Sequence, residues 1–332
     1  MQEFKISEIA TVAGVSAATV DRVLNGRGNV RQATRDKVYK GVERLRKQSS
    51  HEQKVQQSGK SLVFILPSGA GPSIDENLHA FVYNCASERN IQISWRNYDK
   101  LDPHSLAHVL NSINVEQCLG VVMSPLDHPS ITTALARFAL HHIPCVCLLS
   151  EPSPNLRSCS YIGLNNFNAG ETAGYLMSKF NSDQAGRVAV IGGIDKYWGH
   201  KLRFEGFKTS VRAYAPGIKI IPPIYGNDEP EHNHFFIEKL LARYDDLVGI
   251  YNLGSGNRGI VKALIEAERT EQITFFTHNL TSVSKQYVLC GAVDAIITPN
   301  YYQIANRIFD FFITGLECTH YVDFDVRFQT NV

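Results

Sequence analysis

The chain has 332 residues, 33 Lys and Arg against 32 Asp and Glu, and a formal net charge of +1. That length allows two or three domains with sizeable cores. No apolar run approaches the roughly 18 to 20 residues of a membrane span, and the first residues lack the apolar region of a signal peptide. We therefore expect a cytoplasmic protein with no membrane partner.

The small net charge hides an uneven distribution. Residues 1–60 contain 12 of the Lys and Arg and 6 of the Asp and Glu, a balance of +6, which leaves the rest of the chain at −5. Basic charge confined to one end is typical of nucleic-acid binding, and the alternative is an ordinary solvated basic face. The seven cysteines are odd in number, and two of them, Cys145 and Cys147, lie in an apolar run. We expect buried reduced thiols, with neither a disulfide framework nor a metal site.

The first helix is predicted from the spacing of apolar residues. Ile6, Ile9, Ala10 and Ala13 recur at intervals of three and four, which places them on one helical face. Gly14 then allows a turn with positive φ.

The second helix is expected to begin after Ser16, whose hydroxyl is well placed to accept from a free amide of the first turn. Its inward face comprises Val15, Val20, Val23 and Leu24, and its outward face Ala17, Ala18, Asp21, Arg22 and Asn25. A third helix follows, with Val38, Val42 and Leu45 turned inward and many basic residues around it. Two short helices joined by a tight turn, closed by a third, indicate a helix-turn-helix, whose second helix enters the DNA major groove.

The same stretch contains AGVSAATVDRVLNGRGNVRQATRDKV. It resembles the DNA-binding headpiece of the lac repressor family of bacterial transcription regulators over about 45 residues. With the second helix in the groove, Ala17, Ala18 and Arg22 are expected at base edges. Phosphate contacts are expected from Thr19, Asn25, Arg31 and Arg35. The alternative for Arg22 is an ion pair with a nearby acid.

From Gln48 to Lys60 the sequence is polar, QSSHEQKVQQSGK, and by composition this is a linker. In the resembling family this place usually holds a hinge helix with an aromatic-Pro-Asn entry and a Leu that wedges into the minor groove. This chain has neither feature, so strong central kinking of the DNA is not expected. Whether the linker folds on DNA stays open.

Beyond the linker, apolar runs of strand length alternate with segments of helical period. Strands are predicted near 62–67, 91–96, 119–124, 143–149, 159–163, 187–192, 218–225, 247–252, 273–278 and 294–298. Helices are predicted between them, for example at 75–89, 168–180, 200–213 and 259–268. This alternation favours an α/β fold with parallel sheets covered by helices on both faces.

Several stretches resemble the periplasmic-binding-protein-like core of the same regulators: YIGLNNFNAGETAGYLMSKF, GHKLRFEGF, IYNLGSGNRGIVKAL and FFTHNLTSVSKQYVLCGAVDAIITP. The resemblance implies two Rossmann-like subdomains and three chain crossings, near Ile162, 294–299 and 317–321. The expected divisions are a helix-turn-helix headpiece at 1–47, a linker at 48–60 and a core at 61–332. Within the core, one subdomain is expected at about 61–161 and 300–317 and the other at about 162–298 and 320–332.

Ligands of open α/β sheets bind beyond the carboxyl ends of the strands. The polar residues near the predicted strand ends are Ser68, Ser124, Asp127, Asn165, Arg203, Asn252 and His278. Such groups suit a hydroxyl-rich effector such as a sugar or cyclitol, and the alternative is that they cap helices. Arg203 and Asn252 are the closest matches to effector positions of the resembling family. His278 and Thr298 stand where its sugar-binding members commonly have Asp and Gln, so the ligand cannot be copied across.

Gly254 to Gly259 satisfies G-x-G-x-x-G, but the next strand ends in His278 and not in an acidic residue, so no dinucleotide cofactor is expected. An anionic group, as in a phosphorylated sugar, could still bind at that helix start. His141 and His142, and His232 and His234, lack partners at metal-ligand spacing. No catalytic constellation is present, so we expect a protein that is not an enzyme.

The resemblance implies a transcription regulator, in particular a repressor, controlled by a small polar effector. A homodimer reading a pseudo-palindromic double-stranded operator is expected, and association of two dimers stays open. The alternatives are a solute-binding sugar receptor without a regulatory role and a nucleotide-dependent enzyme.

Overall fold

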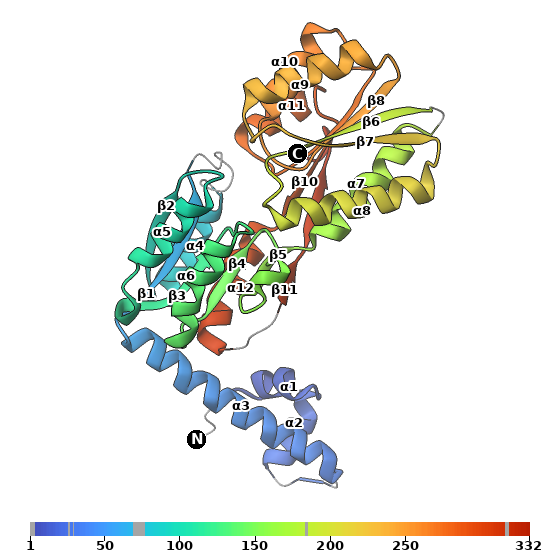
Figure 1. Ribbon diagram of the computed structural model, residues 1–332. Coiled ribbons are helices and arrows are strands. Elements are labelled where there is room, and N and C mark those ends of the chain that lie inside the picture. The colour runs from blue at the N-terminus through green and yellow to red at the C-terminus, as the bar shows by residue number, and fades with distance from the viewer. Residues whose placement is uncertain (1–3, 26, 29, 69–76, 183–184, 316–318) are drawn as a thin grey trace. The chain divides into compact units, whose positions relative to one another are not determined.

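The computed structural model divides into two compact units, Met1–Gly59 with Asp310–Leu316 and Lys60–Phe309 with Glu317–Val332 (Figure 1). The structure describes all residues except 1–3, 26, 29, 69–76, 183–184 and 316–318. Among the described residues, no helix combines the length and apolar character needed to cross a membrane.

The headpiece contains α1 (Ile6–Ala13), α2 (Ala17–Leu24) and the first part of α3 (Gln32–Gln57). α1 ends at Gly14, whose φ of 64° is left-handed. Ser16 caps α2, because its Oγ accepts from the Thr19 amide at 3.2 Å. Ile9, Ala10, Val20, Val23 and Val38 form the small core that joins the helices. The predicted helical headpiece is confirmed.

The linker expected from Gln48 to Lys60 is instead helical as far as Gln57, because α3 continues through it. The segment contains no Pro or Gly before Gly59, and Gln, Glu and Lys are good helix formers. The helix is also supported by the Glu43–Lys47 ion pair of 3.0 Å, one turn earlier. Gly59, with φ of +65°, follows its end.

The first sheet of the core has the strand order β11-β5-β4-β3-β1-β2, and all its pairs are parallel. Its strands are β1 (Ser61–Pro67), β2 (Gln92–Tyr98), β3 (Cys118–Met123), β4 (Cys145–Leu148), β5 (Ser160–Leu164) and β11 (Thr319–Val322). The accompanying helices are α4 (His79–Glu88), α5 (Pro103–Ser112), α6 (Pro129–Leu140) and α12 (Tyr301–Thr314). Leu106 and Leu110 of α5 and Ile131 and Phe138 of α6 pack into one core with this sheet.

The second sheet has the order β12-β10-β9-β8-β6-β7, in which only the β10–β12 pair is antiparallel. Its strands are β6 (Gly186–Gly192), β7 (Ile218–Tyr225), β8 (Leu247–Asn252), β9 (Thr274–His278), β10 (Ala295–Pro299) and β12 (Phe324–Arg327). Its helices are α7 (Asn166–Phe180), α8 (Trp198–Tyr214), α9 (Pro230–Arg243), α10 (Asn257–Glu266) and α11 (Ser282–Leu289). One core joins the sheet to α7 and α8, and another joins it to α9, α10 and α11, so both faces are covered (Figure 1).

The ten predicted strands are all present, and the first and last crossings between the sheets lie a few residues after the places expected. β5 runs to Leu164, so the first crossing follows that residue and not Ile162. The last crossing lies between Val322 and Phe324, because β11 pairs with β5 and β12 pairs with β10. Residues 162–164 and 320–322 therefore belong to the first sheet, whereas we expected them in the second subdomain. β11 and β12 have only four residues each and, unlike β4, do not lie in a continuous apolar run that would predict them.

Two glycines let α7 and α8 approach closely. A Cβ added at Gly170 would overlap the carbonyl oxygen of Arg203, and one added at Gly206 would overlap that of Phe167. Backbone oxygens cannot swing aside as side chains can, so the helices would have to separate. This contact matters for the site described below, because α8 carries Arg203.

We predict that Gly206→Ala lowers the free energy of unfolding by about 1 to 3 kcal/mol, because overpacking forces the backbone to shift. Gly217→Ala is the matched control, since nothing lies within 4 Å of a Cβ at that position. Urea unfolding followed by circular dichroism measures both changes. Equal midpoints for the two variants would contradict the prediction.

Candidate functional site

The outer face of α2 is exposed to solvent. Ala17, Ala18 and Arg22 are exposed, and among the described residues the Arg22 side chain makes no hydrogen bond or ion pair. The nearest acid, Asp21, instead accepts from Asn25 Nδ2 at 2.7 Å and lies 4.0 Å from Arg27. The alternative that Arg22 pairs with a neighbouring acid therefore finds no support here.

The residues expected to contact phosphates differ in exposure and in their hydrogen bonds within the headpiece. Asn25, Arg31 and Arg35 are exposed, and Arg35 Nε donates to the Val30 carbonyl at 3.2 Å. Thr19 is half-buried, and its Oγ1 lies 2.8 Å from Ser16 Oγ. Thr19 thus takes part in the cap of α2.

A polar pocket lies at the carboxyl ends of strands from both sheets of the core. The first sheet supplies Pro67, Lys100, Ser124, Leu149 and Ser150, which follow or end β1 to β4. The second sheet and its helices supply Tyr197, Gly199, His200, Arg203, Asp228, Gly254, Ser255 and Asn279. An adjoining pocket contains Ser68, Asp99, Lys100, Asp228, Glu229, Pro230, Ser255 and Gly256. Both pockets therefore lie where the strand-end rule expects a ligand.

Of the residues predicted from the sequence, Ser124 and Arg203 line the main pocket and Ser68 lines the adjoining one. Asp127 does not line either pocket. Its Oδ1 accepts from Ser153 Oγ at 2.7 Å and from Asn155 Nδ2 at 3.1 Å, which holds a loop. Asn165 caps α7 by accepting from the Asn168 amide at 3.0 Å.

Asn252 and His278 are also absent from the pocket lining. Asn252 is fully buried, and its Nδ2 donates to the Ser255 carbonyl at 2.9 Å and to Asn257 Oδ1 at 2.6 Å. It therefore shapes the loop that carries Ser255. His278 is buried with its Nε2 2.7 Å from Tyr251 Oη, while its neighbour Asn279 lines the pocket. Both residues are buried next to residues that line the pocket, and they do not line it themselves.

Arg203 is a buried residue of the pocket lining, with 5% of its surface exposed. Its Nε donates to Asn166 Oδ1 at 2.6 Å and its Nη1 to the Leu253 carbonyl at 2.5 Å. Asn166 is itself held by Glu151, whose Oε1 accepts from the Asn166 amide at 3.0 Å. Burial lowers the pKa of the guanidinium, but arginine stays charged in proteins. A fixed cation thus faces the pocket.

Asp228 provides the opposite charge, and the sequence analysis missed it. Its Oδ1 accepts from the Ser255 amide at 2.7 Å, and its carbonyl accepts from Lys100 Nζ at 3.3 Å. A Cβ at Gly193 or Gly254 would meet its carboxylate, so both glycines make room for it. Burial raises the pKa of this carboxyl group. Asp228 comes three residues after β7, so the strand-end rule applied to 218–225 would have found it.

Three residues that line the pocket have left-handed backbone conformations without being glycine. The φ values are 63° for Leu149, 55° for Asp228 and 66° for Asn279. Asp and Asn tolerate this region, whereas a leucine there costs on the order of 1 to 3 kcal/mol. The Leu149 amide is held by the Ile162 carbonyl at 3.1 Å. Such strain gathers at binding sites and supports a functional role for this pocket.

His234 lies away from this pocket and has partners that the sequence spacing did not reveal. Its Nε2 is 2.6 Å from Glu266 Oε2 and its Nδ1 is 3.4 Å from Glu238 Oε2. The three are close enough to hold a metal ion, but both ring nitrogens already contact carboxylates and Lys262 lies 3.6 Å from Glu266. We interpret the group as a polar cluster joining α9 and α10.

The partial burial of His200 in the pocket wall predicts a pH dependence of stability. Burial, and to a smaller extent the Arg203 charge, lowers the pKa of His200 to about 3. The unfolded chain takes up a proton near the ordinary pKa of about 6.5, so stability is lost as the pH falls below that value. Between pH 7 and pH 5 the wild type should lose about 2 kcal/mol more unfolding free energy than His200→Gln.

Urea unfolding at several pH values measures this difference. The exposed His108→Gln is the matched control and should follow the wild type. Parallel curves for the wild type and His200→Gln would contradict the prediction.

The headpiece and the core each match the model of a known protein family. Residues 62–313 match the model of the periplasmic binding protein domain, and residues 5–46 match that of the bacterial regulatory proteins of the lacI family. No curated protein matched the chain.

Solved structures share the fold of the core. A solute-binding protein of an ABC transporter from Burkholderia graminis, in complex with D-arabinose, is 20% identical with a TM-score of 0.75, covering 82% of this chain and 97% of its own. One from Agrobacterium vitis, bound with alpha-D-tagatopyranose, is 18% identical with a TM-score of 0.73, covering 82% and 96%. GanP, a glucose-galactose binding protein from Geobacillus stearothermophilus, is 16% identical with a TM-score of 0.72, covering 82% and 99%. The chain belongs to the lacI family of bacterial regulatory proteins and carries a core of the periplasmic binding protein domain family.

Proposed function

We propose that this protein is a transcriptional repressor that binds operator DNA through α2 and releases or retains it according to a carbohydrate-like effector. The proposal depends on two features found in one chain. α2 is capped and exposes the face that would contact DNA bases, and the core has a polar pocket at its strand ends. The two matched families, a regulator and a binding protein, support the same combination.

On DNA, Arg22 is the residue we assign to direct reading. An exposed arginine without a partner among the described residues can give two hydrogen bonds to guanine O6 and N7. Ala17 and Ala18 lie on the same outer face and could pack on thymine methyl groups. Thr19, Asn25, Arg31 and Arg35 are assigned to the phosphate backbone, which fixes position without reading sequence.

The pocket favours a neutral, hydroxyl-rich ligand. Its lining combines the cations Arg203 and Lys100, the acid Asp228 and the neutral polar residues Ser124 and Asn279. Mixed donors and acceptors of this kind recognise hydroxyl groups, whereas a phosphorylated sugar would meet Asp228 unfavourably. The sugars in the related solved structures, D-arabinose and alpha-D-tagatopyranose, agree with this class.

Regulation requires two arrangements of the protein that the effector binds with different affinity. We propose a cytoplasmic homodimer, because a two-fold assembly reads a pseudo-palindrome with half-sites about one helical turn apart. Association of two dimers would add a second operator contact without changing this scheme.

Arg22→Ala should weaken binding to the specific operator by about 1 to 3 kcal/mol and binding to random DNA much less, because it removes base contacts. The matched control Arg96→Ala, exposed on β2, should change neither. Fluorescence anisotropy at fixed salt measures both affinities. Equal losses on the two DNAs would remove Arg22 from the reading role.

Asp228→Asn should lower effector affinity about 10- to 100-fold, because hydrogen bonds to a charged group contribute about 1.5 to 3 kcal/mol. Titration calorimetry against neutral pentoses, hexoses and cyclitols provides the measurement. Asp245→Asn, at an exposed turn, is the matched control. A panel in which nothing binds, or a variant that binds as tightly as wild type, would contradict the assignment.

A further inference from the structure

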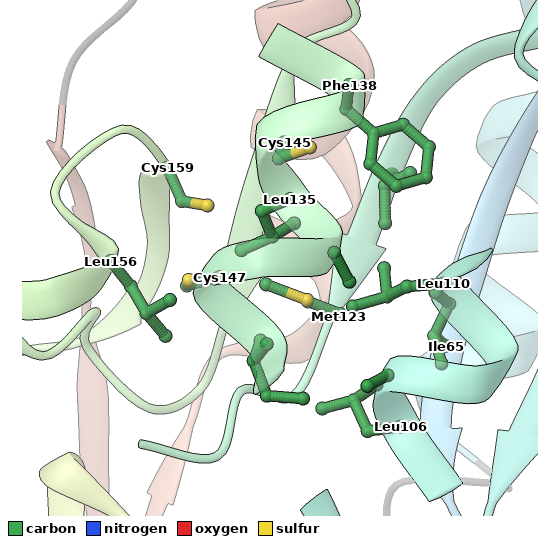
Figure 2. Packing of buried hydrophobic residues seen from close by; sticks show 14 of the residues in the cluster. Ile65, Leu106, Leu110, Met123, Leu135, Phe138, Cys145, Cys147, Leu156 and Cys159 are labelled. Atoms are coloured by element: carbon green, nitrogen blue, oxygen red, sulfur yellow. The ribbon is translucent and has the colours of Figure 1, made fainter. Parts of the chain in front are cut away.

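Three cysteines gather in the core of the first sheet. Cys145 and Cys147 lie on β4, and Cys159 directly precedes β5. Figure 2 shows all three among buried apolar side chains such as Leu135 and Leu156. The Cys145 thiol donates weakly to the Ile143 carbonyl at 3.8 Å. All three are reduced in this structure.

Cys145 and Cys159 stand side by side at the start of the β4–β5 pairing. The first paired residues are Val146 and Ser160, and Cys145 and Cys159 immediately precede them in the chain. Both side chains belong to the core cluster on one face of the sheet. Neighbouring strands lie about 4.8 Å apart, which falls in the range of about 4.4 to 6.8 Å that a disulfide needs between Cα atoms.

The same two thiols are the ones that solvent can approach. A surface pocket is lined by Leu135, Ala139, His142, Ile143, Pro144, Cys145, Ser158 and Cys159. Cys145 and Cys159 keep 8% and 7% of their surface exposed, whereas Cys147 is at 0% and does not line the pocket. A small oxidant can therefore reach Cys145 and Cys159 ahead of Cys147.

The two thiols differ in the direction in which their pKa values are shifted. Donation from Cys145, and then from Cys147, lowers the pKa of Cys159 against the opposing effect of burial. The hydrogen bond to Cys159, together with burial, raises the pKa of Cys145. Because the thiolate is the nucleophile, Cys159 is the thiol that reacts first.

We propose that Cys159 and Cys145 form an oxidation site for small hydroperoxides. The Cys159 sulfur attacks one oxygen of hydrogen peroxide, and the O–O bond breaks. The products are a sulfenic acid on Cys159 and one water molecule. The Cys145 sulfur then attacks the Cys159 sulfur, the S–O bond breaks, and a second water departs with the thiol proton. Two thiols give up two electrons and one peroxide accepts them.

The site is separate from the effector pocket but shares its strand. Cys145 begins β4, whose carboxyl end leads to Leu149 and Ser150 in the pocket lining. A disulfide would tie the start of β4 to the chain that enters β5. The inference does not depend on the proposed DNA-binding function.

The test treats the full-length protein with hydrogen peroxide, blocks free thiols by alkylation and maps tryptic peptides without reduction. Cleavage after Arg157 separates the peptide of Cys145 and Cys147 from that of Cys159. We expect the two peptides to be linked, with the loss of two of the seven thiols per chain. Cys147→Ser should keep the link, and so should the exposed control Cys290→Ser.

Cys145→Ser should abolish the link and leave a sulfenic acid on Cys159 that dimedone traps. A link through Cys147, or oxidation of Cys290 while Cys159 stays reduced, would overturn the proposal. The wild-type map decides between these outcomes even if a variant fails to fold.

Discussion

The arrangement of the core depends on hydrogen bonds to one buried guanidinium group, that of Arg203. Arg203 lies on α8 with almost no exposure, and an unpaired charge in that position would be far too costly to keep. Its partners come from separate parts of the chain: Asn166 at the start of α7 and the Leu253 carbonyl after β8. Glu151, after β4, fixes Asn166 in turn. The requirement to pair this guanidinium therefore connects both sheets at the place where the chain first crosses between them.

The same arrangement explains why the pocket is preorganised. The guanidinium is held by its partners, and the Asp228 carboxylate is held by the Ser255 amide. The close approach of α7 and α8 through Gly170 and Gly206 keeps α8, and so Arg203, in position. A ligand that meets groups already oriented loses less entropy on binding. Lys100, which contacts Asp228 and Glu229, adds a connection between the sheets that an effector can strengthen or replace.

Much of the fold could be predicted from the sequence because buried parallel strands are continuous apolar runs, such as LVFILP and LVGIYN. The headpiece followed from helical spacing, from Gly14 and Ser16 and from its resemblance to a known family. The extension of α3 to Gln57 could not be predicted, because a polar stretch with Val55 as its one apolar residue leaves no periodic signal. β11 and β12 were missed for a different reason, since four residues at a sheet edge show no clear pattern.

The candidate site was predictable only in outline. Strand ends located the pocket, and Ser124 and Arg203 line it. Asn252 and His278 occupy strand ends too, but their side chains turn into the interior, which depends on packing that the sequence does not display. Asp228 and Lys100 reach the pocket from loops, two or three residues past their strands. Loop conformation, including the positive φ of Asp228, decides their position.

The most direct test is to sequence the genomic DNA fragments that the purified full-length protein retains at near-physiological salt, against a form that begins at Ser61. The account predicts that a pseudo-palindromic sequence is enriched by the full-length protein alone, and the genes beside it would point to the effector. No enriched sequence, or equal enrichment by the form without the headpiece, would contradict it.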